Sequence, residues 1–437
     1  MKNDCCVLNF LRYYLIAFVI CAASATVAAQ TNTGADNKNA GSRNGIENFQ
    51  LIGTEQILER EDDNLFIYVP YETDITNIKT NIVVSDLASV SPESGAPMNF
   101  TGPKTYTVTA GDGAEKNYVV TVRKSPWRKA GNGPFSPRDD IELIELNGKL
   151  FLLRGWLHSN PAPRYSREVW TTEDGIIWTK ALEELPWEES VEFKNYISYT
   201  KFNNQIWAFG AGKEGTETWN TSDGVNWTFV NNTSILSSWG RRYWPYVGEF
   251  QNKLYVIGGL NWWDDKGAYI RNSVGTGVFN DVWSSSDGIH WIQEKPFSQF
   301  PPRGMICGFA VLNDMLYIVG GGINMGSVSL EYNDAWASSN GKDWICCHAN
   351  TPWGKTAYHS VAIHDNKIFV ATGTLNGANT SNQIWYSSDG KTWNQVKYCF
   401  FPKRHGTGLV SFKGKLWIVA GGPSLLNDIW YYDVDSQ

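Results

Sequence analysis

Residues 283–291 read WSSSDGIHW, and this nine-residue line decides the fold because it recurs along the chain. It returns at 170–178 (WTTEDGIIW), 219–227 (WNTSDGVNW), 336–344 (WASSNGKDW) and 385–393 (WYSSDGKTW). Asp-Gly or Asn-Gly in the middle is typical of a two-residue hairpin turn that needs positive φ. We therefore expect two strands in each line, with a Trp on each strand, packed across the hairpin.

A second line precedes each of these five, and a sixth copy follows them. It predicts a strand, a polar turn, an apolar strand and usually a Gly pair. Its turns and second strands read NGKLF (147–151), NNQIW (203–207), QNKLY (251–255), NDMLY (313–317), DNKIF (365–369) and KGKLW (413–417). The two lines together predict six repeats of four strands each.

The sixth repeat supplies Asn427-Asp428-Ile429-Trp430 as its third strand but lacks the second Trp. Trp127, just before the first complete repeat, is the missing element. An N-terminal strand at Trp127 would complete the last repeat and close a ring, which removes the exposed edges of an open array. We therefore predict an all-β protein in which residues 125–437 form a closed six-bladed β-propeller.

The Gly pair followed by an aromatic residue resembles the kelch repeat. The Trp-x-Ser-x-Asp-Gly-x-x-Trp line resembles kelch-like propellers related to galactose oxidase. The resemblance covers residues 125–437 and implies the fold. It implies no single function, because propellers include enzymes, lectins and scaffolds.

The first 29 residues have the pattern of a secretory signal peptide, with an apolar run at 13–21 and small residues up to Ala29. That run is too short to span a membrane as a helix. A lipid anchor at Cys21 is disfavoured because bulky Ile20 precedes it. We expect an exported protein, in the periplasm or at the cell surface.

Residues 30–46 are rich in Asn, Gly, Thr and Ser and predict a flexible linker. Residues 47–124 predict an antiparallel β-sandwich with strands at 65–69, 105–109 and 118–122. This segment resembles the small immunoglobulin-like modules that precede functional domains in exported proteins of Bacteroidetes-type bacteria. The resemblance implies the role of a spacer.

Charge and motifs exclude several classes of function. Lys and Arg number 37 against 44 Asp and Glu, a net charge of −7, which argues against nucleic acid as a partner. The sequence contains no P-loop, HExxH, GxSxG or paired CxxC, so neither a cofactor nor a metal site is predicted. After the signal peptide only four cysteines remain, too few for a disulfide scaffold. Of these, Cys346 and Cys347 are either two small buried residues or a strained vicinal bridge.

Strand direction places the loops before each first strand and those between second and third strands on one face, which we call the upper face. The long loops at 156–166, 260–279 and 322–333 all belong to this face, so it is the candidate binding surface. Cations stand near the start of five innermost strands: Arg138, Lys194, Arg242, Arg303 and Arg404. Converging on the channel, they would bind a carboxylate or sulfate group. In the alternative interpretation each cation pairs within the fold with an acidic neighbour: Asp139, Asp140 or Glu249.

Aromatic residues share the same loops and could stack on sugar rings or simply cover the rim. They are Trp156, Tyr243, Trp244, Trp262 and Trp263. His359, which follows Tyr358, and His405 begin innermost strands of adjacent blades and are candidates for general acid–base chemistry. A Tyr-His pair with a second His is similar to part of the copper site of galactose oxidase, but the remaining ligands are not evident and that enzyme has seven blades.

The leading hypothesis is an exported protein that binds carbohydrate, specifically an acidic glycan or sugar, at the upper face of the propeller. One alternative is an enzyme, because six-bladed kelch propellers include sialic-acid epimerases (mutarotases). Another is an extracellular propeller that binds a protein partner. The sequence leaves open whether the protein is an enzyme.

Overall fold

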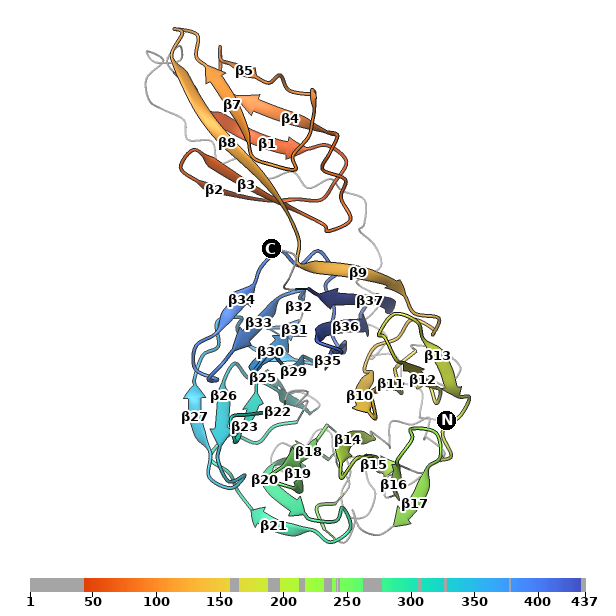
Figure 1. The fold of residues 1–437 in the computed structure, drawn as a ribbon. Coiled ribbons are helices and arrows are strands. Elements are labelled where there is room, and N and C mark those ends of the chain that lie inside the picture. Colours follow the sequence, from red (N-terminus) through yellow and green to blue (C-terminus); the bar gives the residue numbers. More distant parts are fainter. Residues whose placement is uncertain are drawn as a thin grey trace, which may run out of the picture.

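The computed structural model describes residues 43–157, 165–187, 197–211, 217–231, 238–240, 242, 244–261, 277–304, 309–325, 328–376 and 379–433. Every regular element in these ranges is a β-strand. The strands form an N-terminal sandwich and a ring of blades, and β8 leads directly from one to the other (Figure 1).

The sandwich has one sheet of order β1-β4-β6 and one of order β2-β3-β8-β7-β5. The strands are β1 (Ile46–Leu51), β2 (Ile57–Glu61), β3 (Asn64–Val69), β4 (Ile78–Val84), β5 (Ser89–Ser91), β6 (Pro97–Met98), β7 (Lys104–Thr109) and β8 (Glu115–Lys124). Phe49 of the first sheet meets Tyr106 of the second edge-to-face at 5.1 Å, and both are buried. The sequence predicts an antiparallel sandwich, but β3 and β8 pair in parallel.

Six four-stranded sheets in the described ranges form the predicted blades, with their first strands around the centre of the ring (Figure 1). Blade 1 has β10 (Glu142–Leu146), β11 (Lys149–Leu153), β12 (Val169–Thr172) and β13 (Thr179–Leu182). Blade 2 has β14 (Ser198–Phe202), β15 (Gln205–Ala211), β16 (Glu217–Thr221) and β17 (Thr228–Asn231). Blade 3 has β18 (Tyr246–Phe250), β19 (Lys253–Leu260), β20 (Val278–Ser285) and β21 (Ile292–Lys295).

Blade 4 has β22 (Phe309–Leu312), β23 (Met315–Val319), β26 (Ala335–Ser338) and β27 (Ile345–His348). Blade 5 has β29 (Ser360–His364), β30 (Lys367–Ala371), β33 (Ile384–Ser387) and β34 (Asn394–Val396). Blade 6 has β35 (Gly408–Phe412), β36 (Lys415–Gly421), β37 (Leu426–Tyr432) and β9 (Trp127–Asn132). Upper-face loops of blades 4 and 5 carry β24 (Gly322–Met325), β25 (Val328–Glu331), β28 (Thr356–Ala357), β31 (Thr374–Leu375) and β32 (Asn379–Thr380).

The ring is closed by β9, as the repeat pattern predicts. It pairs antiparallel with β37, and Trp127 lies opposite Tyr432 in the register. Trp127 is completely buried and meets Phe401 edge-to-face at 5.0 Å. The last blade is therefore built from both ends of the propeller segment, which leaves β37 no free edge.

The turns between first and second strands use residues suited to left-handed backbone. Each has two residues, and both have positive φ in all six blades; Asn147 (52°) and Gly148 (76°) are one example. This is the geometry of the turns that match the twist of a hairpin. Asn, Asp and Gly tolerate it at low cost.

The Asp-Gly lines do not form the predicted two-residue turns. Six residues separate β12 from β13, and Asp174 organises them because its Oδ1 accepts hydrogen bonds from the backbone N–H groups of Ile176 and Ile177 at 2.8 Å. The Asp side chain takes the place of a backbone partner. The glycine serves the neighbouring blade, since a Cβ on Gly175 would lie closer than 3 Å to the ring of Trp417 in β36.

The sandwich contacts the propeller around Tyr398. The Tyr398 ring stacks on Tyr68 of β3, and its hydroxyl donates to the Glu59 carboxylate at 2.8 Å. The hydroxyl of Ser125, between β8 and β9, donates to the Tyr398 carbonyl at 2.8 Å. These contacts anchor the sandwich next to the strand that closes the ring.

Removing residues 1–120 should leave a folded propeller, whereas removing 1–130 should leave an open and poorly soluble one. The longer truncation deletes Trp127 and most of β9, which exposes the edge of β37. Size-exclusion chromatography and thermal unfolding of the two truncated chains test this. Equal behaviour would contradict closure by β9.

Candidate functional site

Four of the predicted cations near the innermost strands are described, and all four lie inside the blades. We call them the ring arginines: Arg138, Arg242, Arg303 and Arg404. Arg138 and Arg303 are completely buried, and Arg242 and Arg404 nearly so. Each guanidinium donates to a carboxylate of its own blade at these shortest distances: Arg138 to Glu168 (3.1 Å), Arg242 to Asp281 (2.7 Å), Arg303 to Asp334 (2.6 Å) and Arg404 to Asp428 (2.8 Å). In blades 3, 4 and 6 the pair is bidentate.

Two further groups complete this arrangement. Each carboxylate also accepts the indole N–H of the Trp two residues later, as Asp428 does from Trp430 at 2.7 Å. Each guanidinium also donates to the carbonyl of a residue in left-handed conformation, which lies near the end of the second strand or just after it. These carbonyls belong to Arg154, Gly258, Gly320 and Ala420. The cation thus connects the first strand of a blade to the ends of its second and third strands.

The fifth blade shows that the cation and the acid belong together. Thr356 stands where the other blades have a cation, and Gln383 stands where they have the acid. Gln383 still accepts the Trp385 indole N–H at 3.0 Å. Loss of the cation is thus accompanied by loss of the acid, as expected of a pair that acts within the blade.

These contacts match the alternative interpretation of the arginines, although with other partners than predicted. Asp139 lies beside His405, and Glu249 is exposed on β18. Burial raises the pKa of Glu168, but hydrogen bonds from Lys180, Trp170 and Arg138 outweigh it and lower the pKa to about 2. An anion could reach these guanidinium groups only if buried ion pairs opened, which is costly.

The upper face instead brings together four aromatic residues from blades 1, 3 and 5. Trp156 meets Tyr165 edge-to-face at 4.8 Å, and Trp244 meets Tyr358 edge-to-face at 5.8 Å. Tyr165, Trp244 and Tyr358 all pack against one small buried group that contains Leu260 and Ala357. We call the four aromatic residues, together with Asp139 and His405, the upper-face cluster.

Asp139 and His405 connect the two ends of this cluster. His405 lies 5.9 Å from the Tyr358 ring, and its Nε2 is 3.4 Å from Oδ2 of Asp139. Asp139 in turn exchanges two backbone hydrogen bonds with Trp156, at 3.2 and 2.7 Å. The contacts therefore run around the mouth of the channel and return to blade 1.

The backbone at two of these aromatic residues is strained. Trp244 (φ 45°) and Tyr358 (φ 51°) adopt the left-handed conformation. Gly406 occupies the corresponding position of blade 6, two residues after the ring arginine, with φ 55°. A bulky residue in this conformation costs roughly 1–2 kcal/mol, which a glycine avoids, and such strain concentrates at functional sites.

The two candidate histidines differ in access. His405 is partly exposed within the upper-face cluster. His359 is completely buried, and this burial lowers its pKa to about 4, which the backbone carbonyl of Val319 only partly opposes. His359 is therefore neutral at physiological pH and cannot touch a ligand in this structure.

Several predicted positions lie outside the described residues: Lys194, Tyr243, Trp262, Trp263, Cys21 and the signal peptide. In the described ranges no group of three or more His, Cys, Asp or Glu side chains is placed to hold a metal ion. Within the same ranges no helix is long and apolar enough to cross a membrane. Cys346 and Cys347 are free thiols.

Sequence reasoning missed Tyr165 and Arg154. The guanidinium of Arg154 lies over the Tyr165 ring, 4.6 Å from its centroid. A signal for Arg154 was present in the repeat, because Arg154-Gly155 stands where blades 3 and 4 have Gly-Gly. Tyr165 carried no such signal, since its position in a long loop has no counterpart in other blades.

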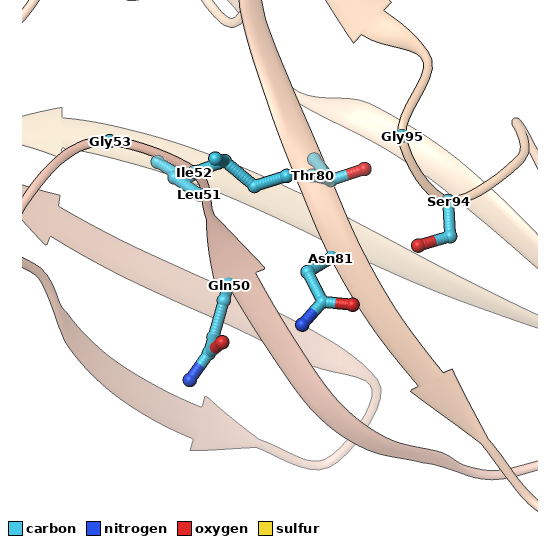
Figure 2. A pocket seen from close by; sticks show the side chains of 8 residues that line it. All are labelled: Gln50, Leu51, Ile52, Gly53, Thr80, Asn81, Ser94 and Gly95. Carbon is cyan, nitrogen blue, oxygen red and sulfur yellow. The ribbon is translucent and has the colours of Figure 1, made fainter. Parts of the chain in front are cut away.

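The sandwich carries a shallow, open hollow beside β1 and β4 (Figure 2). Gln50 and Asn81 lie opposite each other in the strand register at its edge. Its lining contains no aromatic ring and no charged side chain: Gln50, Leu51, Ile52, Gly53, Thr80, Asn81, Ser94 and Gly95. It therefore offers a ligand weaker contacts than the upper-face cluster does.

Comparison with known proteins finds similarity to a family model and to a curated relative. Residues 46–122 match the family model "SGBP, N-terminal", the N-terminal domain of surface glycan-binding proteins. The chain is also 25% identical over 218 residues to Kelch-like protein 40 of Mus musculus, a match that covers 44% of this chain and 30% of that protein. The chain thus matches less than a third of that relative's length. Together with the fold, these findings support a kelch-like propeller with an N-terminal module.

Replacing Arg303 with Ala should destabilise the protein by about 3–5 kcal/mol, because Asp334 would remain mostly buried without its cation. A double variant, Arg303→Thr with Asp334→Gln, copies the neutral pair of the fifth blade and should recover much of that loss. Urea unfolding measures both. Full stability of Arg303→Ala combined with loss of ligand binding would return this arginine to the binding site.

Proposed function

We propose that this is an exported glycan-binding protein of the cell surface and that the upper-face cluster is its sugar-contacting surface. The match of residues 46–122 to the N-terminal domain of surface glycan-binding proteins supports the class. The observation that carries the location is the left-handed backbone of Trp244 and Tyr358, at positions where the repeat accepts glycine.

The chemistry of the cluster suits a sugar. Aromatic side chains offer broad apolar faces on which the C–H faces of a pyranose can stack, and partly buried Trp and Tyr keep polar groups for hydrogen bonds. His405 is partly exposed and donates or accepts hydrogen bonds, while buried Asp139 lies behind its imidazole, so a hydroxyl group of a stacked sugar would find a partner beside the rings.

The preference for an acidic glycan needs a different basis from the one predicted. The ring arginines on which it rested are engaged in buried pairs. Among the described residues, Asp139, His405 and Arg154 are titratable groups in or next to the cluster, and Asp140 lies close to Gly406, beside His405. Our proposal therefore specifies a glycan, and its test compares neutral with acidic ligands.

Trp244→Ala and Tyr358→Ala should each weaken glycan binding by about 2 kcal/mol, roughly thirtyfold, the size expected of a central aromatic contact. A glycan array that includes neutral, uronic-acid, sialylated and sulfated oligosaccharides finds the ligand, and calorimetry then measures the affinity. Phe229→Ala is the matched control, because this aromatic residue is exposed on the outer strand of blade 2. Unchanged affinity in both cluster variants would move the site elsewhere.

A second candidate function is sugar processing by acid–base catalysis. The proximity of His405 Nε2 to Asp139 Oδ2 beside Tyr358 favours it, since a carboxylate can orient an imidazole for proton transfer. Anomer-resolved NMR with sialic acid and with the sugars found on the array tests it. If the protein is such an enzyme, His405→Gln should abolish turnover and retain binding; binding without turnover in the wild type would exclude this function for the sugars tested.

A further inference from the structure

Arg154 departs from the repeat at a position where the repeat requires only backbone. Residue 154 directly follows the second strand of blade 1 with φ 67°, and its carbonyl accepts a hydrogen bond from Arg138 at 3.3 Å. The corresponding residues of blades 3, 4 and 6 are Gly258 (φ 59°), Gly320 (φ 59°) and Ala420 (φ 57°), whose carbonyls accept from their own ring arginines. The blade needs this carbonyl and no side chain beyond Cβ.

An arginine at this position carries an energetic cost. A left-handed conformation strains any residue with a Cβ, and burial removes the guanidinium from water. Arg154 bears both costs, because only 9% of it is exposed. The chain therefore carries a side chain with an energetic cost at a position where blades 3 and 4 have glycine.

The contacts of Arg154 point toward the upper-face cluster. Its Nη1 donates to the carbonyl of Ile197 in blade 2 at 2.7 Å, which restrains the guanidinium. The guanidinium carbon lies over the ring of Tyr165, 4.6 Å from its centroid. Tyr165 itself meets Trp156 at 4.8 Å and packs on the group that supports Trp244 and Tyr358.

Tyr165 pairs with Trp156 through an isolated bridge. The Arg154 guanidinium, which donates to the carbonyl of Ile197, adds a cation–π contact to the Tyr165 ring. This contact constrains the ring from the side of blade 2.

Arg154 also acts on the charge of Glu142, which begins β10. Burial raises the pKa of Glu142 to about 7, and Arg154 only partly opposes this. Glu142 is thus partly protonated near neutral pH, unlike Glu168, which Arg138 and its other partners keep fully ionised.

We propose that Arg154 is a positioning residue of the glycan site, which holds the ring of Tyr165 in place as a stacking surface. The role of Tyr165 as a sugar contact rests on the proposed function, whereas the positioning of its ring does not. The proposed ligand is a pyranose that stacks on the Tyr165 ring. Arg154 does not touch this ligand; it keeps the Tyr165 ring in place.

The test is Arg154→Gly, which restores the residue of blades 3 and 4, with Ala420→Gly as the matched control at the same position of blade 6. The first readout is ¹⁹F NMR of protein labelled with fluorotyrosine, in which Tyr165→Phe assigns the signal. We expect the Tyr165 signal of Arg154→Gly to shift and broaden, and that of Ala420→Gly to match the wild type. The second readout is the affinity for the oligosaccharide found on the array, which should fall about fivefold to tenfold in Arg154→Gly only.

Arg154→Lys separates charge from shape, because it keeps the cation and the strain but loses the flat fork. We expect its Tyr165 signal and its affinity to lie between those of the wild type and Arg154→Gly. An unchanged Tyr165 signal in folded Arg154→Gly would overturn the proposal whatever the affinity. A changed signal in a protein that binds no glycan would support the positioning role and contradict the proposed function. A changed signal with unchanged affinity would restrict Arg154 to holding the loop and overturn its role in the site.

Discussion

A buried guanidinium at the inner edge of the blade is the interaction on which the propeller depends. In four blades it joins a carboxylate, an indole N–H through that carboxylate, and the carbonyl of a left-handed residue. These groups come from three segments of one blade, so the cation sets where the first strand begins and where the second ends. A buried pair of this kind contributes little net stability compared with an apolar replacement, but it is very costly to break. Its main effect is therefore geometric.

That geometry determines what the channel mouth can present. Two residues beyond the ring position, the chain turns through a left-handed residue before it enters the innermost strand. In blade 6 this residue is Gly406, while blades 3 and 5 place Trp244 and Tyr358 there. The left-handed backbone at these two positions thus orients the aromatic side chains of blades 3 and 5 toward each other. Contacts between blades support the result, because each Asp-Gly glycine receives an aromatic ring of the preceding blade, as Gly224 receives Phe151.

The sandwich and the propeller are coupled where the ring closes. Tyr398 contacts β3 and the segment between β8 and β9. The strand that completes blade 6 is therefore held in two ways. It pairs with β37 along its length, and the sandwich anchors its start. In a surface glycan-binding protein such an arrangement would hold the upper face in a constant orientation relative to the N-terminal module. The predicted role of a spacer then becomes that of a rigid support.

The sequence by itself determined the number of blades, their strands and the strand that closes the ring. These features follow from short-range patterns: two Trp residues eight positions apart in each line, polar turns that require positive φ, and one repeat that lacks a strand which the segment at Trp127 supplies.

The sequence did not determine the role of the cations. A shared offset from the lower turns is equally compatible with convergence on a ligand and with pairing inside each blade. The partner of Arg138 lies 30 residues away, at Glu168, and only the folded sheet brings the two charges to 3.1 Å. The upper-face cluster depends still more on tertiary structure. Trp244 and Tyr358 meet across blades 3 and 5, and His405 reaches Asp139 only because the ring closes. Local pattern specifies a blade because its strands are neighbours in sequence, whereas the site joins residues whose proximity exists only after six blades have formed a circle.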